Sequence, residues 1–451
     1  MSNTATNEER SYQDLLARDS RPVPEIYRTV GETDVGPLEV PTSWFLEREI
    51  HDLEVERIWK RTWQMACREE DVPNVGDTWV YDIASLSILI VRVSESEIKA
   101  YYNACLHRGR PLRDCPGNVS QLKCPYHGFT WALDGSLRGV PAREQFPTID
   151  SATFRLPEVK VGRWGGFVFI NPDPAAESLE SHIGKLPEHF RQWPLDERVK
   201  VVHIVRILPA NWKVVQDAFL EAFHVHTTHP QFLLAFGDKF HRIDTFENFS
   251  RGALGAFNPS HYVRWKPNEQ QIFNAAVGAW DDEPPMANIP EGTALRPAVA
   301  DMFRTKMRPI VGSAIDKFTD AEMVDVIWFS LFPNLSPFAG FMSPLTYRFR
   351  PYGDDHTRCL MDVMVLAPVP AGERPPAARE RWLREDQTFM DAPELGVIAP
   401  VLNQDTANLM NIMTGIRNLK RGKMVFAKHH ELKLRHFYML YQKAMGLEAC
   451  A

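Results

Sequence analysis

The sequence predicts an α+β protein in which a small β domain precedes a larger mixed domain. Short β-branched runs separated by turn residues dominate the chain up to about residue 175, and helical patterns mixed with strand-like runs follow. With 451 residues, the chain is long enough for two or three ordinary domains. We expect an N-terminal leader over residues 1–45, a β domain with a preceding helix over 46–175, and a larger domain over 176–451.

The first domain is expected to begin with a helix and to continue as strands. Apolar residues recur with helical spacing over Trp44–Trp63. Four short runs after it are alternating or β-branched, and turn residues such as Pro, Gly and Asn separate them. These strand-like runs are Thr78–Tyr81, Leu86–Val93, Ile98–Tyr102 and Gly166–Ile170.

The second domain mixes helices with strands. Helical patterns occur over Asn211–His226 and Asp405–Asn418. Two proline-rich stretches, Asp281–Pro297 and Ala367–Ala378, are expected to form surface loops. Strand-like runs lie at Val201–Leu208, Val324–Phe332, Thr346–Arg350 and Cys359–Leu366.

Charge and hydropathy argue against two classes of partner. The net charge is −7 and no run of Lys or Arg stands out, so a nucleic-acid partner is not expected. The first twenty residues are polar and lack the apolar segment of a secretory signal. Apolar runs such as Ile88–Val91 are too short to cross a bilayer. We therefore expect a cytoplasmic protein without a membrane partner.

Cysteine and histidine cluster in Asn103–Phe129. This segment contains Cys105-x-His107 and, after sixteen residues, Cys124-x-x-His127. Two thiolates and two imidazoles from paired loops are the ligand set of a Rieske [2Fe–2S] cluster, in which histidines replace two cysteines on one iron. A structural zinc site is the alternative, but zinc fingers pair Cys with Cys and His with His. Cys67, Cys115, Cys359 and Cys450 are interpreted as reduced structural thiols.

The segment resembles the Rieske motif of aromatic-ring-hydroxylating oxygenases. The resemblance rests on His-Arg-Gly at 107–109 and on Cys-Pro-Tyr-His-Gly at 124–128. Respiratory Rieske proteins carry an extra cysteine in each loop, joined as a disulfide, and those positions here hold Arg110 and Tyr126. The resemblance therefore implies an antiparallel β Rieske domain with an oxygenase-type cluster.

A second candidate metal site lies in Asn211–Pro230. The spacing of His224 and His229 is weak evidence alone, since a structural histidine pair would look the same. The whole string, with Asn-Trp-Lys at 211–213 and Glu221 before His224, resembles the mononuclear iron motif of the same family. Such a site needs two histidines and one carboxylate on one face of Fe(II), with the other face open.

The carboxylate ligand must come from elsewhere in the chain. The family supplies it from a late helix, and the segment 401–418 resembles that helix, so the resemblance implies Asp405 as the ligand. The alternative is a helix N-cap or a first-turn acid favoured by the helix dipole.

Glu221 is assigned a different role. Its spacing predicts that it shares a helix face with His224 and bonds the outer nitrogen of that ring. The resemblance implies that Glu221 also bonds His127 of a neighbouring subunit and so bridges the two iron centres, whereas the alternative is a solvated carboxylate. Ala218 departs from the family pattern, in which Asn often follows the acid at this place, and Asp217 receives no role.

The remaining histidine and the aromatic residues near the motif are less informative. His226 is interpreted as a structural residue or as support for the ligands. Some of the nearby phenylalanines could line a substrate pocket, although most are expected in the core. These are Phe219, Phe223, Phe232, Phe236, Phe332 and Phe338.

Taken together, the resemblance implies the terminal oxygenase alpha subunit of a multicomponent Rieske system. Its catalytic domain would have the helix-grip (START-like) fold and form a homotrimer or an α3β3 assembly. O2 would be the co-substrate, and electrons would come from a separate ferredoxin or flavin reductase that oxidises NAD(P)H, because no dinucleotide fingerprint is apparent. We expect an apolar, aromatic substrate and ring dihydroxylation or monooxygenation, as in aromatic hydrocarbon catabolism. Oxidative N- or O-demethylation is the alternative reaction. Two distant alternatives are an electron carrier without oxygenase activity and a structural zinc protein.

Overall fold

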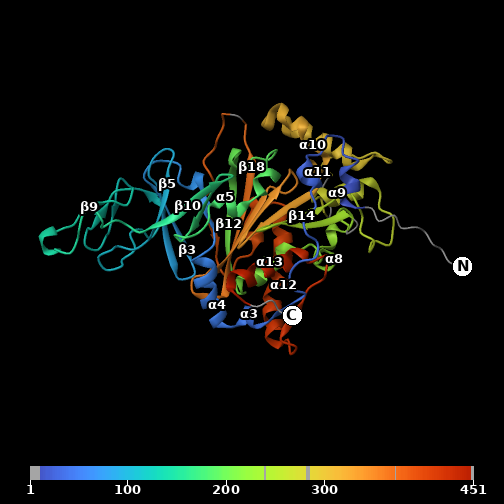
Figure 1. Ribbon diagram of the computed structural model, residues 1–451. Coiled ribbons are helices and arrows are strands. Elements are labelled where there is room, and N and C mark those ends of the chain that lie inside the picture. The colour runs from blue at the N-terminus through green and yellow to red at the C-terminus, as the bar shows by residue number, and fades with distance from the viewer. Residues whose placement is uncertain (1–10, 238–239, 281–284, 371, 448–451) are drawn as a thin grey trace.

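The computed structural model describes residues 11–237, 240–280, 285–370 and 372–447. Cys450, the first ten residues and part of the proline-rich stretch Asp281–Pro297 lie outside the described residues. Figure 1 shows a small β-rich part at one side and a larger part in which helices pack on long strands. The expected α+β class is confirmed.

The small part is built on an antiparallel sheet with the strand order β2-β11-β10-β5-β4-β3-β6. A three-stranded sheet, β7-β8-β9, extends from it. Aromatic and aliphatic side chains, among them Leu89, Tyr101 and Trp131, fill a common core. The strand bounds are β2 (Gln64–Arg68), β3 (Asp77–Ile83), β4 (Leu86–Arg92), β5 (Ile98–Tyr102), β6 (Gly117–Asn118), β7 (Leu122–Lys123), β8 (Thr130–Trp131), β9 (Leu137–Gly139), β10 (Glu158–Trp164) and β11 (Phe167–Asn171).

The helix expected over Trp44–Trp63 is shorter and interrupted. It consists of α3 (Ser43–Leu46), α4 (Arg48–Glu54) and a π-helical turn, η1 (Val55–Trp59). Glu47 has extended backbone angles and separates the first two pieces. Trp63 lies outside the helix because its indole donates to the carbonyl of Glu177 at 2.9 Å, a tertiary contact that overrides the periodicity.

The larger part is built on a second sheet with the strand order β13-β14-β15-β16-β17-β18-β12-β19. Every pair in this sheet is antiparallel except β12 with β19. The strand bounds are β12 (Arg198–Leu208), β13 (His241–Thr245), β14 (Phe249–Leu254), β15 (Val326–Leu331), β16 (Leu335–Ala339), β17 (Leu345–Tyr352), β18 (Asp355–Pro368) and β19 (Arg381–Leu383).

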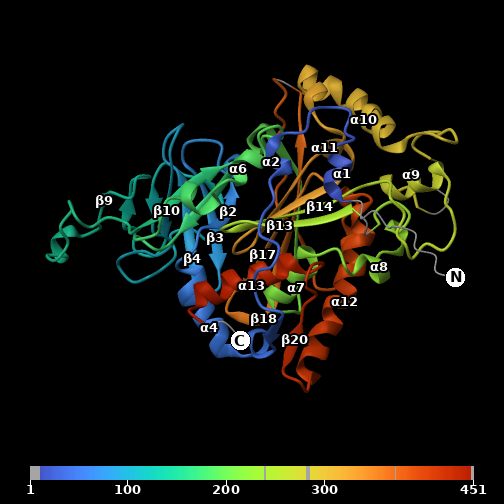
Figure 2. The same cartoon turned by 45° about the vertical axis from the view of Figure 1, so that its right-hand side comes forward.

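Three helices gather at one side of this sheet (Figure 2). The C-terminal helix α13 (Leu432–Met445) contacts β13 and β14, and α7 (Trp212–Leu220) contacts β17 and β18. The long helix α12 (Ile398–Asn418) contacts α7. A curved antiparallel sheet packed on helices is the helix-grip arrangement that the resemblance implied.

The helix expected over Asn211–His226 ends early. Asn211 caps α7 by accepting a hydrogen bond from Lys213 N at 3.1 Å, and the helix stops at Leu220. Glu221 is extended, and a separate short helix, α8 (Val225–Thr228), follows. Glu221 and His224 therefore meet in a turn, not on one helix face.

The sequence did not predict the helices α9 (Glu269–Val277), α10 (Leu295–Val311) and α11 (Asp320–Val324). Part of the expected loop Asp281–Pro297 belongs to α10. Proline is tolerated in this first helical turn because its backbone nitrogen has no intrahelical partner to lose. Shorter helices are α5 (Leu179–Ile183), α6 (Leu186–His189), η2 (Glu69–Asp71), η3 (Arg143–Gln145), η4 (Leu195–Glu197), η5 (Pro230–Phe232), η7 (Gly312–Lys317), η8 (Phe389–Asp391) and η9 (Pro393–Leu395).

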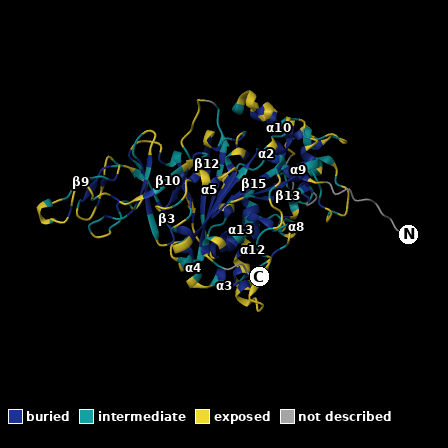
Figure 3. Cartoon of the chain, viewed as in Figure 1, coloured by how far each residue is buried: buried dark blue, intermediate teal, exposed yellow. Residues whose placement is uncertain are grey.

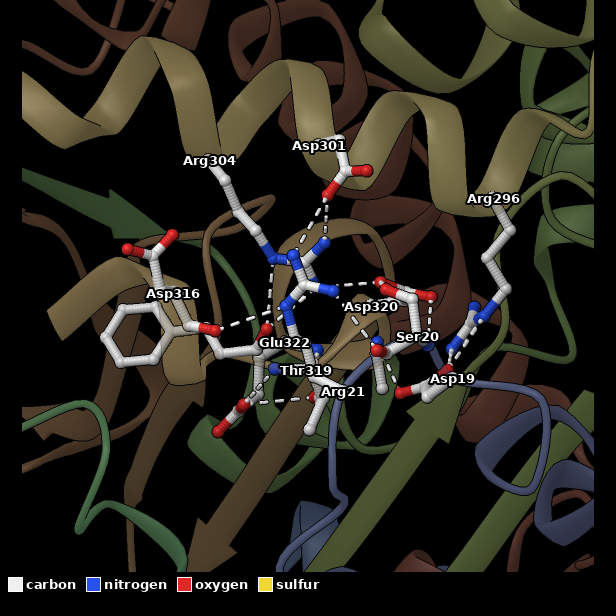
Figure 4. Close-up of polar contacts among 12 residues, drawn as sticks. Asp19, Ser20, Arg21, Arg296, Asp301, Arg304, Asp316, Thr319, Asp320 and Glu322 are labelled. Carbon is white, nitrogen blue, oxygen red and sulfur yellow. Dashed lines mark hydrogen bonds and ion pairs between the residues drawn. The ribbon is translucent and has the colours of Figure 1, made fainter. Parts of the chain in front are cut away.

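The described part of the N-terminal segment is anchored on the larger part of the molecule. It contains α1 (Tyr12–Leu16), α2 (Glu25–Arg28) and β1 (Glu39–Pro41), which pairs with β20 (Lys423–Val425). Asp19 accepts hydrogen bonds from Arg296 on α10, and Ser20 donates to Asp320 on α11 (Figure 4). Buried ion pairs thus fix this segment against α10 and α11.

Buried contacts also join the two parts of the molecule. Figure 3 shows buried residues where the sheets and helices meet, and exposed residues in loops and on outer helices such as α10. Arg348 on β17 donates to the carbonyl of Ala66 on β2 at 2.6 Å and to Asp362 at 2.7 Å. In the described part of the chain, no helix combines the length and the apolar character that a membrane span requires.

Candidate metal centres

Cys105 and Cys124 begin two loops with the same backbone pattern. The backbone N–H of each cysteine donates to a carbonyl five residues on, Arg110 in one loop and Phe129 in the other, at 2.9 and 2.8 Å. Gly109 and Gly128 donate back to the cysteine carbonyls at 2.8 and 3.1 Å. Both glycines have positive φ angles, +77° and +79°, which a side chain would strain. The two loops are therefore matched tight turns that present a Cys/His pair each.

The four side chains of these loops lie together. The rings of His107 and His127 are 4.6 Å apart between centroids, and His107 stacks on Phe129 at 4.7 Å. Both thiols are buried, whereas His127 is exposed. The buried Nδ1 of His107 has no hydrogen-bond partner among the described residues, which fits an atom reserved for a metal. This donor set can hold a Rieske cluster with its histidine edge facing outward.

The positions that carry the extra cysteines of respiratory Rieske proteins have other contacts here. Arg110 forms a two-pronged ion pair with Asp114, at 2.7 and 2.5 Å, and Tyr126 is exposed beside Arg108. Among the described cysteines, all are free thiols. The loops are closed by hydrogen bonds and an ion pair instead of a disulfide.

His224, His229 and Asp405 converge on one point. Asp405 Oδ1 lies 2.8 Å from His229 Nε2 and 3.4 Å from His224 Nε2. One ligand atom from each residue lies within 4.8 Å of the others. His224 comes from the turn after α7, His229 follows α8, and Asp405 sits in the interior of α12. Asp405 is therefore neither a helix cap nor a first-turn acid, since its helix begins at Ile398.

A side-chain oxygen holds the outer nitrogen of each histidine. His224 Nδ1 is 2.5 Å from Glu221 Oε1, and His229 Nδ1 is 2.8 Å from Gln404 Oε1. Such contacts fix the ring orientation and leave the inner nitrogen free for a metal. Glu221 also accepts the backbone N–H groups of Phe223 and His224, so the turn itself orients the carboxylate.

The electrostatics of this triad favour a cation at its centre. Burial alone would lower the pKa of His224, but hydrogen bonds to Asp405 and Glu221 outweigh burial and raise it to about 10. Burial alone would raise the pKa of Asp405, yet the two histidines hold it below its usual value. A divalent metal would satisfy both carboxylates and replace the proton.

A second cluster of side chains that could bind a metal is better explained as a structural ion-pair network. It consists of His203, Asp362 and Glu380. Asp362 accepts hydrogen bonds from Arg348 at 2.7 Å and Arg350 at 3.3 Å, and from His203 at 3.0 Å. The guanidinium charges hold the pKa of Asp362 well below its ordinary value, against the effect of burial. Two cations beside the carboxylate leave no electrostatic demand for a metal.

An apolar cavity of about 250 Å³ opens beside the triad. His224, His229, Asp405 and Glu221 form part of its lining. Aromatic rings from several elements make up much of the wall, namely Phe219, Phe232, Phe236, Trp280, Trp328, Phe338 and Tyr347. A pocket of this kind, with a few polar groups at one point, is typical of a small-molecule site.

Comparisons with known protein families match both parts of the chain. Residues 62–154 match the model of the Rieske [2Fe–2S] domain. Residues 187–447 match the model of the ring hydroxylating alpha subunit (catalytic domain), which is more than half of the chain. The chain belongs to the ring-hydroxylating alpha subunit family. Its cofactors are accordingly a Rieske [2Fe–2S] cluster and a mononuclear non-haem iron.

Curated monooxygenases are similar to this chain over part of its length. The carnitine monooxygenase oxygenase subunit of Escherichia coli (strain K12) is 30% identical over 201 residues, 43% of this chain and 52% of that protein. The chloroplastic choline monooxygenase of Beta vulgaris is 30% identical over 198 residues, 43% of this chain and 44% of that protein. The chain thus spans about half the length of the curated relatives it matches.

A solved structure has the same fold. The crystal structure of the quaternary ammonium Rieske monooxygenase CntA with L-carnitine superposes with a TM-score of 0.64. The match covers 92% of this chain and 97% of that one, at 19% sequence identity. The chain therefore has the fold of a Rieske oxygenase, with a Rieske domain and a helix-grip catalytic domain.

Sequence reasoning missed several residues of this alpha subunit's site. Gln404 and the cavity residues Trp280, Trp328 and Tyr347 carry no local motif. The expected pocket candidates Phe219, Phe232, Phe236 and Phe338 do line the cavity, whereas Phe223 is exposed and Phe332 is in the core.

Asp217 and His226 are not among the lining residues of the cavity. Asp217 accepts a hydrogen bond from Tyr438 at 2.7 Å, and burial raises its pKa to about 8. The His226 ring is 2.9 Å from the carbonyl of Phe223 and does not join the triad.

Proposed function

We propose that the chain is the terminal oxygenase of a multicomponent Rieske system and hydroxylates an apolar substrate. The observation that carries this proposal is the opening of the His224–His229–Asp405 triad onto an apolar cavity. A separate reductase or ferredoxin would supply the electrons, and O2 would be the co-substrate. When bound, the cluster would relay single electrons and the mononuclear iron would activate O2.

The chain's own residues position and isolate this chemistry. His224, His229 and Asp405 would hold the metal from one side and leave the cavity side open. Glu221 and Gln404 keep the two rings in place. The aromatic wall excludes water and holds the substrate over the open side by apolar contact.

The lining of the cavity favours a substrate without a negative charge. Among the described lining residues, the carboxylates and imidazoles are Glu221, His224, His229 and Asp405, and none is Lys or Arg. Lys433 packs 4.6 Å from the ring centroid of Trp328 but does not line the cavity. A carboxylate bound here would lose its hydration without gaining an ion pair, which is costly. A neutral aromatic compound fits this lining, with ring dihydroxylation or monooxygenation as the reaction.

Electron transfer between subunits is part of the proposal. In Figure 1, β9 lies at one side of the molecule, near the Cys/His loops in the sequence. The helix α8, which is next to the triad, lies toward the opposite side. An exposed His127 on one subunit could reach Glu221 on the next in a ring-like trimer, with or without β subunits. The path would then run from His127 through Glu221 to His224.

A second candidate is oxidation of a methylated ammonium group. Both curated relatives above are named for quaternary ammonium substrates. The faces of Trp280 and Phe232 could hold a trimethylammonium cation by cation–π attraction. Choline fits the cavity lining better than carnitine, because carnitine adds a carboxylate that no described lining residue would pair.

The test is substrate-dependent O2 uptake with a surrogate reductase. A panel of neutral arenes, aryl ethers, aromatic acids and methylammonium compounds is incubated with the holoenzyme. We expect uptake and hydroxylated product with neutral arenes or ethers, and formaldehyde release would instead support demethylation. His224→Ala should abolish uptake, while His226→Ala, two residues away and outside the triad, should retain it. Uptake that is unaffected by His224→Ala would refute the proposal.

A further inference from the structure

Tyr347 brings an uncommitted hydroxyl group to the apolar cavity. Its side chain is buried, with 4% of its surface exposed, and it lines the cavity together with the triad. Among the described residues, no hydrogen-bond partner of the hydroxyl is found, and its main electrostatic neighbour is the Asp405 carboxylate. A hydroxyl group in an apolar cavity has few partners there, so a partner from outside the chain is expected.

The ring of Tyr347 is held in a fixed position. Phe219 packs at 5.0 Å and Phe338 at 5.5 Å between ring centroids, the latter edge-on at 88°. Tyr347 belongs to the central strand β17 and pairs with Val363 on β18. A hydroxyl on such a rigid support is preorganised to bind one group at one place.

The hydroxyl is protonated and therefore available as a donor. Burial raises the pKa of Tyr347 above its ordinary value. The rest of the lining offers few alternatives, because Ser343 is the other hydroxyl residue among the described lining residues.

We propose that Tyr347 positions the substrate by donating a hydrogen bond to it, and that the substrate is a neutral ring compound with one acceptor oxygen or nitrogen. This inference rests on the proposed function, because it concerns the same cavity. The acceptor would be bound by Tyr347 near Asp405, and the ring would lie among the aromatic wall residues. Substrates that lack an acceptor would leave the hydroxyl unpaired and bind more weakly.

Binding of two isosteric probes to the anaerobic holoenzyme tests the inference. Acetophenone has a carbonyl acceptor, and α-methylstyrene has a methylene group in its place. Affinities are followed by tryptophan fluorescence, because Trp280 and Trp328 line the cavity. We expect Tyr347→Phe to weaken acetophenone binding by about two- to tenfold relative to α-methylstyrene, the range of one neutral hydrogen bond.

Tyr352→Phe is the matched control. Tyr352 lies on the same strand and packs against Arg358, outside the cavity. It should leave the affinity ratio of the two probes unchanged. The inference would be overturned by an affinity ratio that is unchanged in Tyr347→Phe or that changes equally in both variants. It would also be overturned if neither probe binds to the wild type.

The outcome separates this inference from the proposed function. If substrate-dependent O2 uptake is observed but the affinity ratio does not respond to Tyr347→Phe, the positioning role alone fails. If the ratio responds but no O2 uptake is found with any compound, the oxygenase proposal fails and the binding role of Tyr347 stands.

Discussion

Gln404 shows how a single residue outside the motifs can shape the candidate metal site. Its Oε1 lies 2.8 Å from His229 Nδ1 and also accepts a hydrogen bond from Gln231 at 2.7 Å. The contact fixes the ring so that Nε2 points to Asp405. Gln404 thus orients His229 as Glu221 orients His224, but its acceptor is a neutral amide oxygen instead of a carboxylate.

Gln404→Leu should lower the iron affinity of the mononuclear site about 10- to 100-fold. The substitution keeps the side-chain volume but removes the acceptor that orients His229. The measurement is a competition titration of Fe(II) against a chelator. Asn411→Leu, an exposed position on the same helix, is the control and should bind iron like the wild type. Equal affinity in both variants would mean that Gln404 does not orient the ligand.

His189 is a buried histidine that the oxygenase chemistry does not use. Aromatic rings surround it, including Phe329 at 5.1 Å and Phe246 at 5.5 Å, and neither ring nitrogen has a hydrogen-bond partner among the described residues. Burial, reinforced by the charge of Arg251, lowers its pKa to about 3. The folded protein therefore keeps this ring neutral in mild acid.

Stability should depend on pH through His189. Between about pH 3 and the unfolded value near 6.5, the unfolded chain binds a proton here and the folded chain does not, so stability falls as the pH falls through this window. At pH 5 the loss from this residue is about 2 kcal/mol. His189→Phe should lose less stability than the wild type between pH 7.5 and pH 5, as measured by denaturant titration. The control is His429→Phe, an exposed position, which should behave like the wild type. Equal losses of stability in His189→Phe and the wild type would contradict the lowered pKa of His189.

At the scale of elements, the N-terminal segment acts as part of the larger domain. Arg296 on α10 bonds Asp325 at 2.5 and 2.9 Å and Asp19 at 3.0 Å, and both acids are fully buried. Figure 4 shows Arg296 and Asp19 at one end of this polar network. The guanidinium joins the segment to a helix nearly three hundred residues later in the chain.

Arg296→Met should destabilise the protein by about 3–5 kcal/mol, because two buried carboxylates lose their cation. Arg308→Met on the same helix is the control, since its ion pair with Asp316 is exposed and is worth about 0–1 kcal/mol. Thermal or denaturant unfolding of both variants measures the difference. Similar unfolding of the two would show that the anchor contributes no more than a surface ion pair.

Elements were predicted where a local pattern determines them. The expected strand Ile98–Tyr102 coincides with β5, and Leu86–Val93 differs from β4 by one residue. The break after Leu220 was missed because helical periodicity continues through the turn, and the backbone contacts of Glu221 decide the geometry. The helices α9 to α11 were missed because their burial depends on distant strands.

The candidate sites differ in how far the sequence could indicate them. Cys105, His107, Cys124 and His127 lie in two short loops, so their spacing suggests a cluster site before any fold is known. Asp405 follows His229 by 176 residues, and only the resemblance to a known motif pointed to it. Gln404 and Tyr347 have no motif, because their roles arise from packing against residues far away in the chain.

On the scale of the whole molecule, the account requires transfer of electrons between subunits. Glu221 bonds His224 in one subunit and is proposed to contact His127 of the next. Glu221→Gln should leave both metal sites filled but slow the reduction of the mononuclear iron, because the neutral amide cannot replace the carboxylate between two imidazoles. Metal analysis and single-turnover kinetics measure the two effects, and fast reduction in this variant would refute the bridge.

We propose that one polypeptide holds two separate iron centres at the residues assigned above. The most direct test is iron and acid-labile sulfide content, with EPR spectra, of protein purified anaerobically from iron-replete cells. We expect about three irons and about two sulfides per chain, and loss of about one iron with unchanged sulfide in His224→Ala. The assignment of two iron centres would be contradicted by a colourless protein with zinc as its only metal. Loss of sulfide in His224→Ala would also contradict it.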